Sequence, residues 1–264
     1  MKVITAVINN PIFIEMQYYT LKKHMKCDYE FIVFNDAKNF PDFSNGNDIH
    51  VKQIIIDTCN KLGIQCINIP NERHKIETQA SIRTADSMNY ILKYQRANPD
   101  KYLLIDSDMF LIDDFHIDEF EKYNCAFVLQ TRYEETVKYF WNGIYFLDIN
   151  KMTNLEIFNW NCSPGCDTGG MTHKWFNRQQ DKSTIYFMKY LQSCTWDEND
   201  LPEKFKKNKK LITFLKEDPR NIDDKYFCEI YEDKFFHYRA GGNWEHRKMK
   251  DHVELTYKLK NALL

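Results

Sequence analysis

Two kinds of apolar segment alternate through the first half of the chain. Short apolar runs such as "KVITAVI" at 2–8 have the pattern of buried strands, and longer segments such as 12–25 have the apolar spacing of amphipathic helices. A regular alternation of strand and helix is typical of a parallel sheet with right-handed crossover connections. The alternation therefore predicts the α/β class, with a mostly parallel central sheet flanked by helices.

The same reasoning places each expected element on the sequence. The expected strands lie at 2–8, 29–34, 64–69, 102–105, 124–130 and 143–149, and the expected helices at 12–25, 48–63, 77–97, 173–192 and 245–263. Gly63 is expected to end the second helix. A closing hairpin is expected at 225–231 and 234–240, and the basic run at 203–210 is expected to be a solvated face. Because there is neither an internal repeat nor a clear domain boundary, 1–264 is expected to form one domain.

Composition and charge narrow the classes of partner. With a formal net charge of −2, the chain has no basic excess that would require nucleic acid or an anionic membrane. No apolar run approaches the roughly 20 residues that a membrane-spanning helix needs. The eight cysteines are scattered, and the amino terminus lacks the apolar region of a secretion signal. These features predict reduced thiols and a cytoplasmic protein without a transmembrane anchor. Heavy use of Lys, Asn, Ile, Phe and Tyr fits an AT-rich genome, and for a viral protein the compartment would be the host cytoplasm.

The strongest chemical signal is the segment "KYLLIDSDMFLIDD" at 101–114. Asp106 and Asp108 directly follow an apolar strand, and residues i and i+2 of an extended chain point to the same side. In open α/β sheets, ligands bind beyond the carboxyl ends of the strands, where the winding reverses. Two carboxylates there can share one divalent cation, and oxygen ligands suit Mg²⁺ or Mn²⁺. A surface turn is the alternative, since short Asp-rich turns are common, but apolar residues on both sides favour a metal site.

The stretch "YLLIDSDMFLI" resembles the DxD segment of GT-A-fold glycosyltransferases, which use a nucleoside-diphosphate sugar as donor. The resemblance is to the glycogenin and bacterial galactosyltransferase group and to glycosyltransferases of large DNA viruses. It implies a GT-A, Rossmann-like fold with a nucleotide-binding half at 1–112 and an acceptor and sugar half at 113–264. The nucleotide contacts that it implies come from Asn35, Asp36, Arg83, Asp106 and Ser107. For Arg83, a solvated helix charge is an equal alternative.

A second resemblance lies in "FFHYRAGGNWEH" at 235–246, which is similar to the His-x-x-Gly-x-x-Lys-Pro-Trp segment of the same group. His237 matches the histidine that completes the metal shell there, and imidazole beside two carboxylates favours Mn²⁺ over Mg²⁺. The chain departs from the motif, because Trp244 comes one residue early and Asn243 replaces the Lys-Pro pair. The implied diphosphate contacts are therefore Gly241 and a substitute for the lysine, chosen among Arg239, Arg247 and Lys248.

A third resemblance concerns the donor sugar. The stretch "WNGIYFLDI" at 141–149 is similar to the Asn-x-Gly strand that lines the donor-sugar pocket in that group, and the Gly-rich turn "CDTGG" follows at 166–170. The implied donor-sugar contacts are Asn142, Gly143, Asp167 and Gly169. Gln180-Asp181 echoes an acidic pair of the group, so Asp181 rivals Asp167 as the catalytic carboxylate.

Together the resemblances imply a metal-dependent glycosyltransferase that moves a sugar from a nucleoside-diphosphate sugar, with a UDP-sugar favoured, to a hydroxyl of a glycan or protein acceptor. Asp108 and His237 would bind Mn²⁺ (or Mg²⁺) directly, with Asp106 nearer the ribose. The likeness to glycogenin favours retention of configuration. Two alternatives stay open: a phosphatase of the haloacid dehalogenase type, which also places Asp-x-Asp after an apolar strand, and a nucleotide-sugar-binding protein that has lost turnover.

Overall fold

The computed structural model describes residues 1–41, 48–242 and 249–264. Its centre is a seven-stranded sheet in the order β3-β2-β1-β4-β7-β6-β8. Four neighbouring strands run parallel: β1 (Lys2–Val7), β2 (Glu30–Asn35), β3 (Gln65–Asn68) and β4 (Lys101–Ile105). β7 (Val137–Asp148) pairs antiparallel with β4 and with β6 (Cys125–Arg132), and β8 (Ile185–Phe187) runs parallel to β6. The sheet confirms the predicted α/β class and its mostly parallel strand order.

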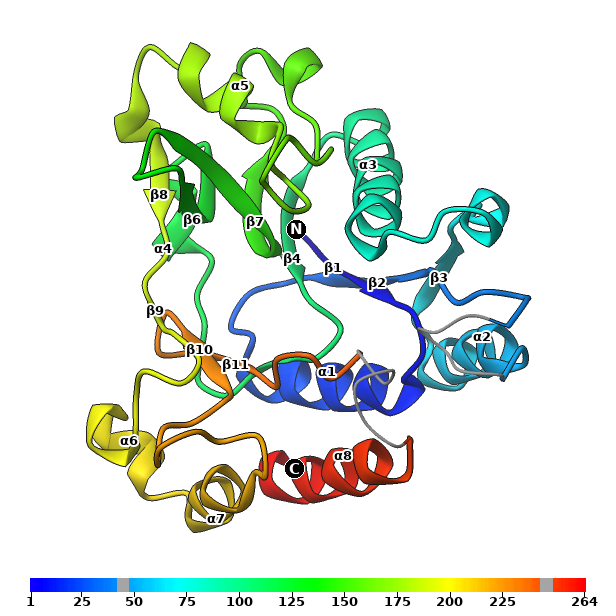
Figure 1. Cartoon of the computed structure of the whole chain (residues 1–264), viewed down its shortest axis with the longest axis vertical. Coiled ribbons are helices and arrows are strands. Elements are labelled where there is room, and N and C mark those ends of the chain that lie inside the picture. Colours follow the sequence, from blue (N-terminus) through cyan, green and yellow to red (C-terminus); the bar gives the residue numbers. More distant parts are fainter. Residues whose placement is uncertain (42–47, 243–248) are drawn as a thin grey trace.

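Helices cover both faces of this sheet (Figure 1). α1 (Pro11–His24) and α2 (Val51–Leu62) pack on one face, and α3 (Ala80–Ala97) packs on the other. Successive side chains of β1 point to opposite faces, so Val3 joins the core under α1 while Ile4 joins the core under α3. Burial on both sides explains why the parallel strands read as continuous apolar runs. α2 ends at Gly63 in the left-handed conformation, with φ of 66°, as the sequence predicts.

A second, four-stranded antiparallel sheet lies beside the first. Its order is β5-β11-β10-β9, with β5 at Met109–Leu111, β11 at Phe235–His237, β10 at Glu229–Tyr231 and β9 at Tyr190–Leu191. β10 and β11 form the predicted closing hairpin, although the paired strands are shorter than expected. One face of this small sheet packs with α7 (Lys209–Glu217) and α8 (Met249–Leu263) in a third core cluster.

The predicted helix at 173–192 is wrong beyond its first two turns. α5 covers only Thr172–Arg178, and the chain then passes through a 3₁₀ turn, η3 (Lys182–Thr184), into β8 and β9. Ile185 pairs with Cys125 of β6, and Tyr190 pairs with Tyr231 of β10. The apolar run "IYFMKYL" at 185–191 is short enough to fit a helix or a strand equally. Pairing with strands remote in sequence therefore decides its structure.

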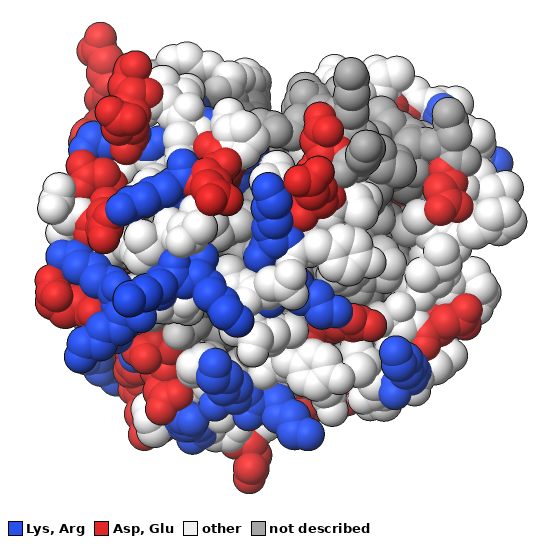
Figure 2. Space-filling model, turned by 90° about the horizontal axis from the view of Figure 1, so that it is seen from below, with Lys and Arg blue, Asp and Glu red and all other residues white. Residues whose placement is uncertain are grey.

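The remaining elements are short and lie near the surface. They are α4 (Asp118–Glu121), α6 (Glu203–Lys206), η1 (Glu72–Lys75), η2 (Leu155–Ile157) and η4 (Glu198–Asp200). α6 and the start of α7 carry the basic run, whose lysines are mostly exposed and partly ion-paired, for example Lys206 with Glu203. Figure 2, which shows the underside of the molecule, has Lys and Arg side chains gathered among Asp and Glu. Across the described residues, no helix has the length and apolar character to cross a membrane.

Candidate active site

A pocket opens where the winding of the large sheet reverses. From β1 the chain proceeds outward to β2 and β3, whereas β4 lies on the other side of β1. The pocket has a volume of about 840 Å³ and is lined at this edge by Ile8, just after β1, and by Asp106, Ser107 and Asp108, just after β4. The carboxylate pair therefore lies at the switch point, where ligands of open α/β sheets bind.

Asp106, Asp108 and His237 come together at this edge. One ligand atom of each lies within 4.8 Å of the others, and this is the one group of three potential metal ligands among residues 1–41, 48–242 and 249–264. His237 Nε2 is 3.2 Å from Asp108 Oδ1. The register of the small sheet explains the meeting, because His237 in β11 pairs directly with Met109 in β5, the residue after Asp108.

Glu229 holds the other side of the imidazole. Its Oε2 is 2.9 Å from His237 Nδ1 and also accepts a hydrogen bond of 2.8 Å from the Tyr231 hydroxyl. Glu229 and His237 are direct partners in the β10–β11 ladder, and both are buried. A carboxylate on the far nitrogen of a histidine is the usual device that orients a metal-binding imidazole.

The electrostatics of the site point to a missing positive charge. Burial and the neighbouring Asp108 raise the pKa of Asp106 to about 7. Burial alone would lower the pKa of His237, but Asp108 and Glu229 outweigh it and raise the pKa to about 10. Burial likewise opposes ionisation of Asp108 and Glu229, but the His237 cation keeps the pKa of each below its ordinary value. One protonated imidazole thus compensates two buried carboxylates and leaves Asp106 uncompensated.

Backbone contacts fix the two aspartates. The Gly241 N–H donates to Asp108 Oδ2 at 2.7 Å, and a Cβ added at Gly241 would lie 2.9 Å from Asp108 Cβ. The Gln17 side chain, in α1, donates to the Asp106 carbonyl at 2.7 Å and to the Met109 carbonyl at 3.1 Å. These contacts hold the turn between β4 and β5 in one conformation.

The three side chains fit a divalent cation. Two carboxylates and one imidazole, close together and short of positive charge, form a donor set that suits Mn²⁺ and accepts Mg²⁺. Asp108 and His237 are buried, whereas Asp106 is partly open to the pocket. The chain therefore covers one side of the cation position and leaves the pocket side for a ligand.

Of the residues predicted to bind the nucleotide, all but Asn35 line the pocket. Asp36, Arg83 and Ser107 line the pocket together with Asp106. The Asp36 carboxylate already accepts hydrogen bonds from Lys38, Asn71 and Ser87. Asn35 does not line the pocket, because its buried side chain donates to the Lys52 carbonyl and accepts from the Ala37 N–H.

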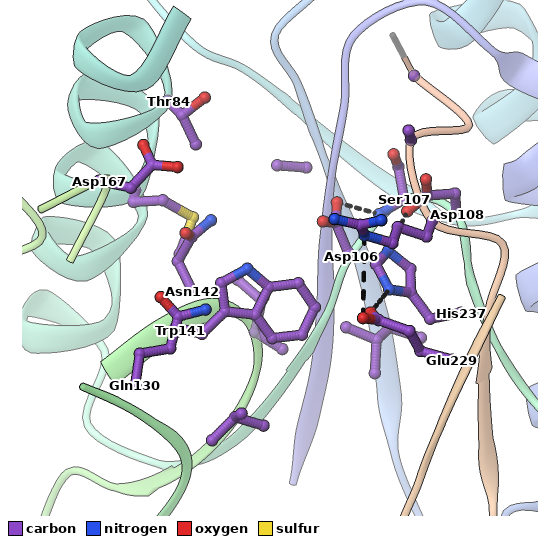
Figure 3. A pocket seen from close by; sticks show the side chains of 18 of the residues that line it. Thr84, Asp106, Ser107, Asp108, Gln130, Trp141, Asn142, Asp167, Glu229 and His237 are labelled. Carbon is purple, nitrogen blue, oxygen red and sulfur yellow. Dashed lines mark hydrogen bonds and ion pairs between the residues drawn. The ribbon is translucent and has the colours of Figure 1, made fainter. Parts of the chain in front are cut away.

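The predicted donor-sugar residues are similarly divided (Figure 3). Asn142 and Asp167 line the pocket, across from the Asp106–His237 cluster and with the Trp141 indole between. Gly143 and Gly169 stand where there is no room for a side chain. An added Cβ would lie 2.1 Å from the Trp141 ring at Gly143 and 2.2 Å from the Phe140 carbonyl oxygen at Gly169. Asp181 lies outside the pocket. Its exposed carboxylate accepts hydrogen bonds from Ser183 and caps the start of η3.

Of the predicted diphosphate contacts, Arg239 lines the pocket. Its guanidinium lies 4.9 Å from the Phe227 ring centre, its Nη1 donates to Ser193 Oγ at 3.0 Å, and its side chain remains 45% exposed. Gly241 contacts Asp108, as described above. Lys248 and Arg247 lie outside the described residues.

Sequence reasoning missed Glu229, Trp141 and Gln17. Glu229 lies opposite His237 only because the hairpin closes with a loop of three residues, one more than the predicted strands leave between them. Trp141 lines the pocket next to the point where the register of β7 against β6 shifts, between Phe127 and Val128, and such an irregularity has no clear local sequence signal. Gln17 is a polar side chain on the buried side of an apolar helix, a position that often marks a specific contact.

Comparisons with known proteins find similarity at the level of structure. No protein-family model and no curated protein matches the chain. Among solved structures, it is similar to an active-site mutant of LgtC, with 12% identity over 97% of this chain and 95% of that chain and a TM-score of 0.46. It is also similar to the galactosyltransferase LgtC in complex with donor and acceptor sugar analogues, with 13% identity over 71% and 73% of the two chains and a TM-score of 0.42.

A third similar structure is the bifunctional glycosyltransferase WbbM, with 11% identity over 71% of this chain and 38% of that chain and a TM-score of 0.40. The chain is thus similar to solved glycosyltransferases, the class that its DxD segment resembles.

Proposed function

We propose that this protein is a metal-dependent glycosyltransferase that takes a nucleoside-diphosphate sugar, UDP-sugars first, and transfers the sugar to an acceptor hydroxyl. The observation that carries the proposal is the Asp106–Asp108–His237 group at the switch point of the sheet, facing a pocket of about 840 Å³. That volume is within the range of small-molecule and cofactor sites and suits a ligand as long as a nucleotide sugar.

The lining residues divide along the pocket into three proposed subsites. The nucleoside would lie beside Ile8, Asp36 and Arg83, near the ends of β1 and β2. The diphosphate would lie between the metal ligands and the Arg239 guanidinium, and the sugar would reach Asn142 and Asp167. Gly241 would act by holding Asp108, and Ser107 would border the ribose.

The chemistry follows from these placements. The bond between the anomeric carbon and the phosphate oxygen breaks, its electron pair leaves with the nucleoside diphosphate, and the acceptor oxygen forms the new bond as its proton departs. Bound Mn²⁺ or Mg²⁺ would supply Lewis-acid stabilisation of the leaving group's charge. Arg239 would add a second positive charge beside the same oxygens. Asp167 is the pocket carboxylate proposed to contact the sugar hydroxyls or the acceptor proton, in place of Asp181.

The test is turnover of a donor panel. Purified protein is incubated with UDP- and GDP-sugars and Mn²⁺, and release of nucleoside diphosphate is measured with the Asp108→Ala variant in parallel. We expect release from at least one donor, a loss of about a hundredfold or more in Asp108→Ala because a metal ligand is removed, and unchanged circular dichroism. Undiminished release in the variant would refute the site.

The alternatives predict other results. A phosphatase of the haloacid dehalogenase type would be stabilised by beryllium fluoride and not by UDP with Mn²⁺. A nucleotide-sugar-binding protein without turnover would be stabilised by UDP with Mn²⁺ and would release no nucleotide. We also propose a cytoplasmic location, in line with eight cysteines that are all free thiols.

A further inference from the structure

Three aromatic rings form a column that joins the two sheets at the pocket. Trp141 of β7 stacks on Tyr231 of β10, with ring centres 5.3 Å apart and planes 18° apart. Tyr231 stacks in turn on Tyr190 of β9, with ring centres 5.1 Å apart and planes 11° apart. All three residues line the pocket. We call this set, Trp141, Tyr231 and Tyr190, the aromatic column.

The column is fixed at the end nearest the metal ligands. The Tyr231 hydroxyl donates to Glu229, which also binds His237, and the Trp141 ring centre lies 5.4 Å from that of His237. The indole lies so close over Gly143 that a Cβ there would be 2.1 Å from it. Trp141 and Tyr231 are therefore held in place before any ligand arrives.

The far end of the column is open. Tyr231, in the middle of the column, is buried, whereas Tyr190, at the end away from Trp141, is 38% exposed. Gln192 lies two residues after Tyr190 and lines the pocket as well, and Gln130 and Asn142 flank Trp141 (Figure 3). Within the described parts of the chain, the side-chain amides of Gln130, Asn142 and Gln192 make no hydrogen bond. A flat aromatic surface thus lies beside side-chain amides that no other protein group engages.

The column lies on the side of the pocket opposite the proposed nucleoside subsite. Ile8 and Asp36 follow β1 and β2, whereas the column comes from β7, β9 and β10 (Figure 1). The metal ligands lie between these two sides, with His237 against the column and Asp106 at the end of β4. A nucleotide sugar anchored by its diphosphate at the metal ligands would therefore direct its transferable end toward the column.

We propose that the open end of the aromatic column is the acceptor subsite and that the acceptor is a carbohydrate, stacked through one face of a pyranose ring on Tyr190. The inference rests on the proposed function and chooses between its glycan and protein acceptors. A pyranose ring has one face of C–H groups, which packs on the negative face of an aromatic ring and buries apolar surface. Its hydroxyls lie around the rim of the ring, where the side-chain amide of Gln192, two residues after Tyr190, can exchange hydrogen bonds with them.

The test measures carbohydrate binding separately from nucleotide binding. Fluorescently labelled protein, with UDP and Mn²⁺, is applied to an array of oligosaccharides and to an array of peptides. The variants are Tyr190→Ala, Tyr190→Phe and the matched control Tyr19→Ala, which removes a tyrosine of similar exposure (46%) on α1, outside the pocket. A thermal shift with UDP and Mn²⁺ is recorded for every variant.

We expect the wild-type protein to bind at least one oligosaccharide, and Tyr190→Ala to weaken that binding about tenfold or more through loss of the stacked ring. Tyr190→Phe keeps the ring and should bind like the wild type, as should Tyr19→Ala. Three results would each overturn the inference. They are binding of the protein to peptides and not to saccharides, a lack of saccharide binding although UDP and Mn²⁺ stabilise the protein, and binding of the saccharide by Tyr190→Ala as tightly as by the wild type. If UDP and Mn²⁺ give no shift while saccharide binding still depends on Tyr190, the donor proposal fails and the carbohydrate subsite stands.

Discussion

At the scale of single residues, the site depends on a chain of contacts from Asp108 through His237 to Glu229. Asp108 belongs to the segment that the sequence singles out, and His237 to a weaker motif that it also singles out. Glu229 completes the chain only because two strands pair. The carboxylate pair could be predicted because its signal is local, an apolar strand followed by Asp-Ser-Asp. The carboxylate behind the histidine could not, because its role exists only in the folded ladder.

Removing the charge of Glu229 should weaken metal binding. Glu229→Gln keeps the size of the side chain but no longer compensates or orients the imidazole, and loss of such a partner typically costs about 10- to 100-fold in metal affinity. We expect that decrease in the affinity for Mn²⁺, measured by isothermal titration calorimetry. Glu232→Gln is the matched control, because Glu232 is a partly buried carboxylate that contacts Tyr186 and Lys189 instead. Equal affinities in the two variants would contradict the role of Glu229.

Metal binding should also strengthen as the pH rises. In the metal-free protein the pKa of His237 is raised to about 10, so its ion pairs stabilise the fold fully below about pH 6.5 and cease to do so as the pH approaches 10. A metal ion needs the neutral imidazole, so binding between about pH 7 and 9 should release one proton and tighten about tenfold per pH unit. Below pH 7 the Asp106 carboxyl, with a pKa of about 7, should also release a proton and steepen the dependence. Calorimetric titrations at several pH values test this, and a flat profile would count against His237 as a ligand.

At the scale of elements, the turn that follows β11 determines the position of Asp108. The backbone of Gly241 lies against that carboxylate, whereas an added Cβ at the neighbouring Gly242 would meet its nearest atom only at 3.9 Å. The two glycines therefore form a matched pair for substitution.

Gly241→Ala should displace Asp108 or the turn, because its Cβ would lie 2.6 Å from the Tyr238 ring and 3.0 Å from Asp108 Oδ2. We expect a loss of Mn²⁺ affinity of about tenfold or more in Gly241→Ala and a change of less than about threefold in Gly242→Ala. The measurement is the same calorimetric titration, with the free energy of unfolding recorded for both variants. If both bind Mn²⁺ alike, Gly241 has no role in positioning Asp108.

The elements themselves differ in how far sequence determines them. α1, α2 and α3 carry helical periodicity, and Gly63 marks the end of α2, so local pattern suffices for them. β8, β9 and β5 are two or three residues long and owe their structure to β6, β10 and β11. The prediction of one helix at 173–192 is therefore wrong, because β8 and β9 form only by pairing with β6 and β10, and Asp181 precedes them in a surface turn.

At the scale of the whole molecule, Arg220 connects the end of α7 to the residues that follow the strand carrying His237. It forms a buried ion pair with Asp218, the residue after α7. Arg220 donates to Asp218, and its Nη1 also donates to the Tyr238 and Arg239 carbonyls at 3.1 and 2.6 Å. Its guanidinium lies 4.0 Å from the Tyr238 ring centre, and its side chain is 5% exposed.

Arg220→Ala should lower the free energy of unfolding by about 3–5 kcal/mol, because it leaves the buried Asp218 carboxylate without its cation. Chemical denaturation provides the measurement. Lys216→Ala is the control, because its ion pair with Glu198 is at the surface and should contribute at most about 1 kcal/mol. A loss in Arg220→Ala no larger than in the control would mean that the buried pair does not stabilise the fold.

The pairing of strands across position 112 has a consequence for the integrity of the chain. β4 pairs with β7, and β5 pairs with β11, so each sheet contains strands from both sides of that position. The polypeptides 1–112 and 113–264 would each expose an unpaired strand edge, a template for association with another chain. The first would carry Asp106 and Asp108, and the second would carry His237 and Glu229. The two are therefore suited to fragment complementation, in which neither piece binds the cation alone and their reassociation restores one site.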